Sequence, residues 1–390
     1  MSYKIAFISL GCAKNLVNSE QMLSLVAKAG HRVVSEPEEA DAVVINTCGF
    51  IDSAKSEAIE NILEMAQLKQ AGKLRKIIVT GCLAQRYRDE ILAELPEVDA
   101  LVGVGSYAEI VQVIEEAMSG GNPCRFGDKS APVDELDRIV STGPGWAYIK
   151  IAEGCNNRCA YCVIPSIRGR FRSRPMENIV REAEDLARRG VKELIVVAQD
   201  ITRYGVDLYG ERSLPELLRR LCNIEGIHWV RLHYLYPDEI DDNLITVIAD
   251  EPRILKYLDI PIQHIDNEIL RKMNRRGTGD EIRSLFKTLR RRIPGLVLRT
   301  SLIVGLPGEG ETEFEELCDF LREARIERAG VFVFSPEEGT PAAAMPGQVD
   351  RETAERRAEL VMELQSAIMD EFNRSRIGQT LEVLCEGFDE

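Results

Sequence analysis

The chain has 390 residues, of which 45% are hydrophobic and 29% charged, and its formal net charge is −15. These values are typical of a globular protein of two or three domains. They argue against a protein that holds nucleic acid mainly by neutralising phosphates, because that needs a basic surface. No apolar run reaches the roughly 18 residues of a membrane span, and the first residues, MSYKIAFISLG, indicate a strand rather than a signal peptide. We therefore expect a cytoplasmic protein with reduced thiols and no membrane partner.

The first part of the chain alternates short apolar runs with helical stretches. The strand candidates are 3–10, 41–47 and 75–81, and the helix candidates are 18–29, 54–71 and 85–94. Such alternation predicts an open parallel α/β sheet domain over residues 1–125. Residues 126–145 are rich in Gly, Pro and Asp, which predicts a linker.

Six further strand candidates follow, and each of the first five leads into an amphipathic helix. They are 146–152, 193–199, 228–235, 256–262, 296–304 and 329–334. Residues 146–345 are therefore predicted to form a partial (β/α)6 barrel with its site at the carboxyl ends of the strands. Residues 346–376 indicate a long C-terminal helix. A strand over 379–387 would begin a third, β-rich module, of which 377–390 hold only the start.

Three cysteines lie close together in EGCNNRCAYC, namely Cys155, Cys159 and Cys162. The spacing is C-x3-C-x2-C, and neither Cys nor His follows before Cys222. Three thiolates can hold three irons of a [4Fe–4S] cluster and leave the fourth iron open to a substrate or cofactor. The alternatives are buried thiols or a structural zinc site, but zinc sites of this kind favour two cysteine pairs that give four ligands.

Three more cysteines each follow a predicted strand of the first domain, namely Cys12, Cys48 and Cys82. Strand ends of an open parallel sheet converge on one crevice, so these cysteines are expected to meet in space and to leave a fourth ligand position open. The alternative is that they are small buried side chains. The remaining cysteines are interpreted as structural: Cys124, Cys222, Cys318 and Cys385.

These motifs together resemble those of the radical S-adenosylmethionine (SAM) methylthiotransferases, and most closely the RimO-type branch. The resemblance rests on SLGCAKNLVNSE (9–20), NTCGFIDSAK (46–55), GCNNRCAYCVIPSIRGRFRSRP (154–175), LDIPIQHIDNEILRKMNRRGT (258–278) and SLIVGLPGE (301–309). It covers nearly the whole chain. The family ends in a small β-barrel, the TRAM domain, and residues 377–390 are identified as the beginning of a truncated one.

The resemblance implies both an activity and its cofactors. A [4Fe–4S] cluster on Cys155, Cys159 and Cys162 would bind SAM and cleave it with one electron. The resulting radical would take a hydrogen from the β-carbon of an aspartate in the twelfth protein of the small ribosomal subunit. A second [4Fe–4S] cluster on Cys12, Cys48 and Cys82 would supply the methylated sulfur. Such an enzyme implies an electron donor such as flavodoxin, and we expect it to be a monomer.

Several residues near the predicted barrel mouth are candidate SAM contacts: Tyr161, Gln199, Asp200, Gly305 and Gly308. Tyr161 could equally cover the cluster. The two glycines could equally serve an ordinary strand-to-helix turn.

Two further features carry a weaker signal. His264, in the same region, is interpreted as a structural hydrogen-bonding residue. Four arginines on alternate positions in RGRFRSR (168–174) favour a docking strip for an anionic group or the substrate loop over a solvated face.

Two other functions fit parts of the pattern. A tRNA adenosine methylthiotransferase would use the same chemistry, but the segments around Cys12 and Cys48 resemble the ribosomal-protein branch, and the acidic charge suits a basic protein substrate. An iron–sulfur electron carrier would have closed, four-ligand clusters and no need of a six-unit βα array.

Overall fold

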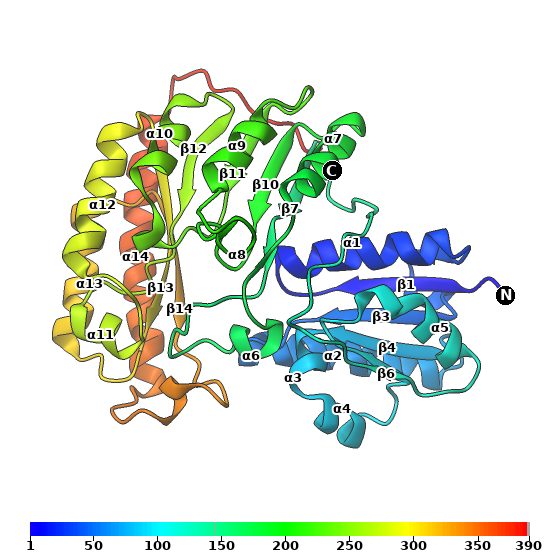
Figure 1. Ribbon diagram of the computed structural model, residues 1–390. Coiled ribbons are helices and arrows are strands. Elements are labelled where there is room, and N and C mark those ends of the chain that lie inside the picture. The colour runs from blue at the N-terminus through cyan, green and yellow to red at the C-terminus, as the bar shows by residue number, and fades with distance from the viewer. Residues whose placement is uncertain (144, 388–390) are drawn as a thin grey trace. The chain divides into compact units, whose positions relative to one another are not determined.

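The computed structural model describes residues 1–143 and 145–387 in two compact units (Figure 1). The first unit holds Met1–Thr142, Glu153–Asn156 and Val163–Arg174. The second holds the described residues of 143–152, Asn157–Cys162 and the described residues from Pro175 onwards, so one of the divisions falls inside β8 (Ala152–Glu153). None of the described helices has the length and apolar composition that crossing a bilayer requires.

The first unit is built on a six-stranded, all-parallel sheet in the order β2-β1-β3-β4-β5-β6. Its strands are β1 (Lys4–Ser9), β2 (Arg32–Val34), β3 (Ala42–Thr47), β4 (Lys76–Gly81), β5 (Ala100–Val102) and β6 (Cys124–Arg125). Its longer helices are α1 (Ala13–Lys28), α2 (Asp52–Gln70), α3 (Cys82–Arg86), α4 (Arg88–Glu94) and α5 (Ile110–Met118). The later segment adds α6 (Ile164–Arg168) and β9 (Arg172–Ser173). The predicted α/β sheet is confirmed.

Helices cover both faces of this sheet, because successive strand residues point to opposite sides. Ile5 and Val44 pack with side chains of α1 and α5, whereas Ala6 and Val43 pack with side chains of α2 and α4. Every residue of β3 is buried. The single helix predicted over 85–94 is instead two helices, because the backbone at Tyr87 leaves the helical region (φ −123°, ψ 41°).

The second unit holds a six-stranded parallel sheet in the order β14-β13-β12-β11-β10-β7. The strands are β7 (Trp146–Lys150), β10 (Glu193–Val197), β11 (Trp229–Leu232), β12 (Ile254–Asp259), β13 (Val297–Val304) and β14 (Arg328–Val333). All six predicted strands are present, and neighbours in sequence are neighbours in the sheet. In β13 every second side chain is buried and the others are partly exposed. This strand therefore leaves one face of the sheet partly exposed, unlike a closed barrel, whose interior is filled with side chains.

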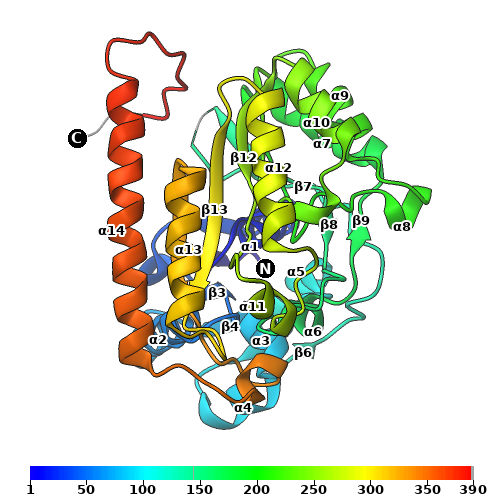
Figure 2. The same ribbon diagram turned by 90° about the vertical axis from the view of Figure 1, so that its left-hand side faces the viewer.

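Helices connect and cover these strands. They are α7 (Met176–Arg188), α8 (Val206–Tyr209), α9 (Leu214–Cys222), α10 (Asp242–Asp250), α11 (Asn267–Lys272), α12 (Gly279–Arg292), α13 (Glu311–Ala324) and α14 (Arg351–Ser375). Figure 2 shows α12, α13 and α14 beside one another along the outside of the unit. Short 3-10 turns complete the fold: Pro37–Glu39, Tyr107–Glu109, Pro237–Glu239 and Pro341–Ala344.

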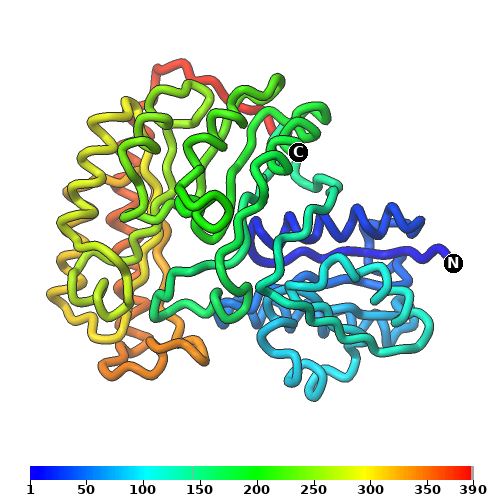
Figure 3. Tube along the Cα trace, viewed as in Figure 1, coloured from blue at the N-terminus to red at the C-terminus, as the bar shows by residue number. Residues whose placement is uncertain are grey.

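The chain after α14 does not form the strand predicted over 379–387. Its described residues run back across the second unit without regular structure (Figure 3). Glu382 Oε1 lies 2.9 Å from His228 Nε2, and the Leu384 side chain lies against Gly145. A strand needs neighbouring strands to be stable, and the described part of this segment has none.

Candidate functional site

Cys12, Cys48 and Cys82 lie at the carboxyl ends of three adjacent strands, as predicted. Cys12 precedes α1, Cys48 directly follows β3, and Cys82 is the first residue of α3 after β4. Since β1, β3 and β4 are neighbours in the sheet, the three cysteines share one edge of the first unit.

Two glycines let the loops that carry these cysteines approach one another. A Cβ at Gly11 would lie 2.8 Å from Cys48 Cβ, and one at Gly49 would lie 2.7 Å from Leu83 Cα. Gly11 also has a φ of 87°, which side chains rarely adopt. The Cys12 loop therefore packs on Cys48, and the Cys48 loop packs on the start of α3.

The surroundings of the three thiols differ in their effect on pKa. Burial works to raise the pKa of Cys12, but Lys14, Arg168 and backbone N–H groups outweigh it and lower the pKa. Burial and the neighbouring Cys82 raise the pKa of Cys48 to about 11. Burial also raises the pKa of Cys82, although Arg168 opposes it. Because thiolates are the metal-binding form, metal binding here must displace protons.

The three cysteines fit an iron–sulfur cluster by the chemistry of their thiols, because such a cluster bonds each cysteine ligand to a different iron. Within residues 1–143 and 145–387, no group of three or more Cys, His, Asp or Glu side chains is placed to hold a single metal ion. In addition, the buried hydroxyl of Tyr107 has no hydrogen-bond partner among the described residues. It lies within electrostatic range of Cys12 and Cys82. Buried polar groups normally have a hydrogen-bond partner, so this hydroxyl is suited to face a group bound by the cysteines.

The C-x3-C-x2-C segment begins in the first unit. Its first cysteine, Cys155, donates its backbone N–H to Gly169 O at 3.2 Å. Two residues earlier, Glu153 Oε1 accepts from Arg168 Nη1 at 2.8 Å.

The rest of the segment belongs to the second unit and is held by hydrogen bonds. Ala160 N–H donates to Met273 O at 2.8 Å, and Ala160 O accepts from Ala342 N–H at 2.9 Å. Arg275 lies over the Tyr236 ring at 4.1 Å and donates to Cys159 Sγ at 3.7 Å. The Tyr236 hydroxyl lies 3.9 Å from the same sulfur. Cys159 is thus a buried cysteine whose sulfur contacts a guanidinium and a phenol hydroxyl.

The candidate SAM contacts have clear structural surroundings. Tyr161 packs against a buried cluster that includes Leu306 of the GLPGE loop, and burial raises its pKa well above the usual value. Gly305 and Gly308 have φ values of 78° and 79°. A Cβ at Gly305 would collide with Ala354 of α14, and one at Gly308 with Lys272. Close packing therefore requires a glycine at 305, whereas at 308 the collision is with the flexible end of Lys272 and it is the positive φ that favours glycine. The contact of either glycine with SAM stays a prediction.

Asp200 holds the cysteine loop in place. It is 1% exposed and accepts from Asn157 Nδ2 at 2.8 Å and from Thr202 N–H at 3.0 Å. Burial raises the pKa of its carboxyl, against these hydrogen bonds. Because Asn157 lies two residues before Cys159, this carboxylate fixes the loop. Gln199, beside it after β10, is partly buried, and its role as a SAM contact also stays a prediction.

Sequence reasoning missed Glu309, which holds the GLPGE loop in shape from within. Its buried carboxylate accepts from Gly305 N–H at 3.0 Å and from Leu306 N–H at 3.3 Å. Arg357 of α14 donates to Glu309 Oε1 at 2.9 Å and also to its backbone oxygen. Glu309 itself was visible in the motif SLIVGLPGE, but its partner Arg357 lies 48 residues further along the chain, where no local pattern points to it.

Replacing Arg357 with Met should therefore destabilise the protein by about 3–5 kcal/mol, because it leaves the Glu309 carboxylate buried without its cation. Urea unfolding of the apoprotein measures this. Replacing Arg351 with Ala is the matched control. Arg351 forms an exposed pair with Glu355 on the same helix, and losing such a pair costs less than about 1 kcal/mol. The double variant Arg357→Met/Glu309→Gln should recover part of the loss; no recovery would contradict the pairing.

His264 behaves as the structural residue that we predicted. It is 1% exposed, and its Nδ1 accepts from Asp266 N–H at 3.1 Å. Burial lowers its pKa to about 3, so the fold holds the neutral ring.

This predicts an acid-sensitive contribution to stability. The contribution is complete above the unfolded pKa near 6.5, and it is lost as the pH falls from there towards 3, because the unfolded chain takes up the proton first. The loss should reach roughly 3–5 kcal/mol at full protonation. Urea unfolding of the apoprotein and of His264→Asn between pH 4 and 7 tests this: the variant should show a flatter profile, and equal slopes would refute the assignment.

The predicted arginine strip is wrong for two of its four members. Arg168 and Arg174 are 1% and 3% exposed. Arg174 donates to Glu135 Oε2 at 2.6 Å, and Arg168 pairs with Glu153. Alternation along the sequence indicated exposure, but acidic partners elsewhere in the chain draw these side chains inward.

Two strained positions mark the strand ends of the second unit. Tyr234 and Gln263 follow β11 and β12 and have φ values of 66° and 72°. Such backbone conformations cost about 1–3 kcal/mol each and cluster at functional sites. They strengthen the prediction that the carboxyl ends of these strands form the working face.

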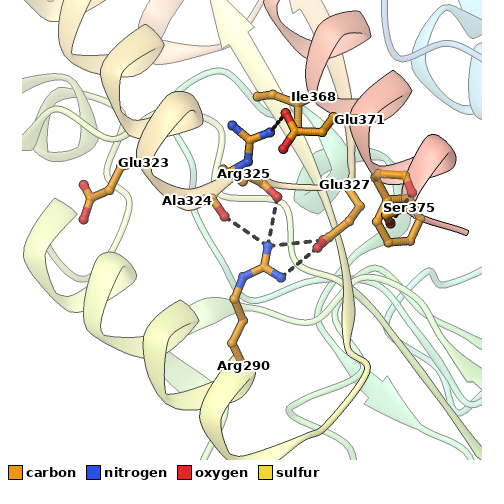
Figure 4. Close-up of a pocket in the computed structure, with 9 residues that line it drawn as sticks. Arg290, Glu323, Ala324, Arg325, Glu327, Ile368, Glu371 and Ser375 are labelled. Atoms are coloured by element: carbon orange, nitrogen blue, oxygen red, sulfur yellow. Dashed lines mark hydrogen bonds and ion pairs between the residues drawn. The ribbon is translucent and has the colours of Figure 1, made fainter.

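A groove of about 420 Å³ lies elsewhere, between α12, the connection that precedes β14, and the end of α14 (Figure 4). Arg290 donates there to Glu327 Oε1 at 2.7 Å and to Ala324 O at 3.0 Å, and Arg325 pairs with Glu371. Since Arg290 shortly precedes β13, and Ala324, Arg325 and Glu327 directly precede β14, the groove is at the amino ends of these strands. None of the predicted site residues lines it.

Comparison with known proteins decides the family. Residues 4–103 match the Uncharacterized protein family UPF0004, and residues 149–321 match the Radical SAM superfamily. A protein of Pelotomaculum thermopropionicum named ribosomal protein uS12 methylthiotransferase RimO is 52% identical over 99% of this chain and 87% of its own length. A protein of the same name from Acetivibrio thermocellus is 51% identical over 100% of this chain and 88% of its own length. The chain belongs to the RimO family.

As a RimO-family member, the chain is a radical SAM methylthiotransferase that uses SAM and a [4Fe–4S] cluster. The resemblance noted from the sequence is thereby confirmed. The number of clusters and their ligands are treated below as proposals.

Solved structures agree with the fold. The radical S-adenosylmethionine methyltransferase TsrM from Kitasatospora setae, solved with cobalamin and a [4Fe–4S] cluster, has a TM-score of 0.63 at 15% identity, over 88% of this chain and 77% of that one. The cobalamin-dependent enzyme OxsB has a TM-score of 0.57 at 12% identity, over 95% of this chain and 56% of that one. At such identities the likeness supports the architecture of the RimO-family chain.

Proposed function

We propose that the chain adds a methylthio group to the β-carbon of an aspartate in ribosomal protein uS12 and that it uses two [4Fe–4S] clusters. The observation that carries the substrate is the 52% identity, over 99% of the chain, to a protein named as a uS12 methylthiotransferase. The net charge of −15 suits a basic ribosomal protein. A ribosomal substrate supports a cytoplasmic location, which is part of the proposal. A flavodoxin-like electron donor and a monomeric state complete the proposal.

Cys155, Cys159 and Cys162 would hold the first cluster, which when bound supplies the electron for reductive cleavage of SAM. The chain's own part is to position Cys159 and to shield it from water. Arg275 and Tyr236 do this from one side, and Asn157 is fixed by Asp200.

Cys12, Cys48 and Cys82 would hold the second cluster, where the transferred sulfur is assembled. Support comes from their placement on adjacent strand ends, from Gly11 and Gly49, which bring their loops together, and from the Tyr107 hydroxyl. The cations Lys14 and Arg168 offset the charge of the thiolates.

An anaerobic reaction with SAM and dithionite tests this function. Purified uS12 and an anticodon stem-loop RNA are offered in parallel, and both are analysed by mass spectrometry. A methylthio gain on one aspartate of uS12 alone is the expected result. A gain on the RNA alone would assign the enzyme to tRNA modification. If neither gains mass and no 5′-deoxyadenosine forms, the enzyme assignment itself fails and an electron carrier becomes the better interpretation.

A further inference from the structure

Arg168 is the most deeply buried member of the former arginine strip, and its partners all belong to the first unit. It ends the short helix α6, and Ile167 of this helix and Val163 just before it pack against Cys82. Its Nη1 donates to Glu153 Oε1 at 2.8 Å, and its Nη2 donates to Asn15 Oδ1. One guanidinium thus links the loop that enters the C-x3-C-x2-C segment to the start of α1.

Asn15 extends this link to the three strand ends. Its Nδ2 donates to Thr47 O at 2.9 Å and to Leu10 O at 3.1 Å, so it binds the residue before Cys48 and the residue two before Cys12. Its Oδ1 lies 3.9 Å from Cys82 Sγ. Asn15 is fully buried, and the guanidinium of Arg168 therefore has a fixed position relative to the three cysteines.

The charge of Arg168 lies close to the cysteine site. Its Nη2 donates to Asn15 Oδ1, the atom that lies 3.9 Å from Cys82 Sγ, and the residues just before it pack against Cys82. Its partner Glu153 brings a carboxylate to the same place. A buried charge acts more strongly than an exposed one, because little water screens it. The potential of an iron–sulfur cluster depends on nearby charge and on hydrogen bonds to its sulfurs.

We propose that Arg168 is a positioning residue that sets the reduction potential of the group held by Cys12, Cys48 and Cys82, with Glu153 as its opposing charge. The inference rests on the proposed second cluster. Adding an electron to that cluster adds negative charge, so the guanidinium stabilises the reduced form and the Glu153 carboxylate destabilises it. The two side chains should therefore shift the potential in opposite directions.

The test uses the full chain with Cys155, Cys159 and Cys162 replaced by Ala, so that only the N-terminal cysteines can hold a cluster. After anaerobic reconstitution, iron content is measured and the midpoint potential is determined by EPR-monitored redox titration. Arg168→Met, Arg168→Lys and Glu153→Gln are compared in this background. Arg138→Met is the matched control, because Arg138 forms a buried pair with Glu20 in the same unit. Circular dichroism checks that each variant folds.

Arg168→Met should make the potential more negative by at least a tenfold change in the reduction equilibrium, about 59 mV for one electron. Arg168→Lys should fall between that value and the parent, Glu153→Gln should shift the potential in the positive direction, and Arg138→Met should leave it unchanged. If Arg168→Met does not fold, the sign of the Glu153→Gln shift decides alone. Unchanged potentials in a loaded background would overturn the role of Arg168 while leaving the second cluster intact. A background chain that binds no iron–sulfur cluster would overturn the second cluster and this inference together.

Discussion

Replacing Cys159 with Ala should abolish the reductive cleavage of SAM and remove about half of the iron from the reconstituted enzyme. An iron–sulfur cluster held by three thiolates has no spare protein ligand, so loss of one leaves it without a stable site. Substitution of groups outside the ligand set of a metal typically costs 10–100-fold, so we expect loss of a ligand to exceed about 100-fold. The measurements are 5′-deoxyadenosine formed per enzyme and iron per chain.

Cys318→Ala provides the control for this result. Cys318 is a buried cysteine on α13 and is not among the proposed ligands, so its variant should keep full iron and full SAM cleavage. Normal 5′-deoxyadenosine formation by Cys159→Ala would contradict the assignment of the C-x3-C-x2-C segment.

Replacing Cys48 with Ala should separate the two activities, with product formation lost and SAM cleavage retained. The methylthio product on uS12 should fall by more than about 100-fold, for the same reason, while 5′-deoxyadenosine still forms. The physical reason is that Cys48, at the end of β3, is a proposed ligand of the second cluster only, whereas SAM cleavage depends on the cluster proposed for Cys155, Cys159 and Cys162. Product and 5′-deoxyadenosine are measured in the same reaction.

Cys124→Ala is the control for this separation, since Cys124 lies on β6 of the same sheet and is not a proposed ligand. It should retain both activities. If Cys48→Ala makes product at the parent rate, the sulfur does not come from this site.

Much of the architecture could be predicted because its signals are local. Runs such as ELIVVAQ and LVLRTSLIV are rich in β-branched residues and have the length of a typical strand. The strands β10 and β13 lie within them. The short strands β2, β5 and β6 escaped prediction. Each has only two or three residues, and their order comes from pairing with neighbours rather than from their own sequence.

The cysteine sets could also be proposed from sequence, since spacing and strand ends are visible there. What could not be predicted is how the surrounding polar groups are paired. Arg168 and Glu309 find partners that no spacing rule indicates, Asn15 in one case and Arg357 in the other. The strand expected over 379–387 failed for a related reason: its β-rich composition is a local property, but a strand exists only where another strand receives it. The domain boundaries proposed from sequence stay a prediction, and the contacts assign Val163–Arg174 to the first unit.

The contact between α14 and the GLPGE loop has a consequence for how this family can change over time. Ala354 leaves no room for a Cβ at Gly305, and one turn along the helix Arg357 neutralises Glu309. The residues of α14 that face the loop therefore cannot be substituted independently of the loop residues, although they lie far apart in the sequence. We expect substitutions at 305 and 354, and at 309 and 357, to occur as compensating pairs among relatives, so that an alignment would show these positions varying together or not at all.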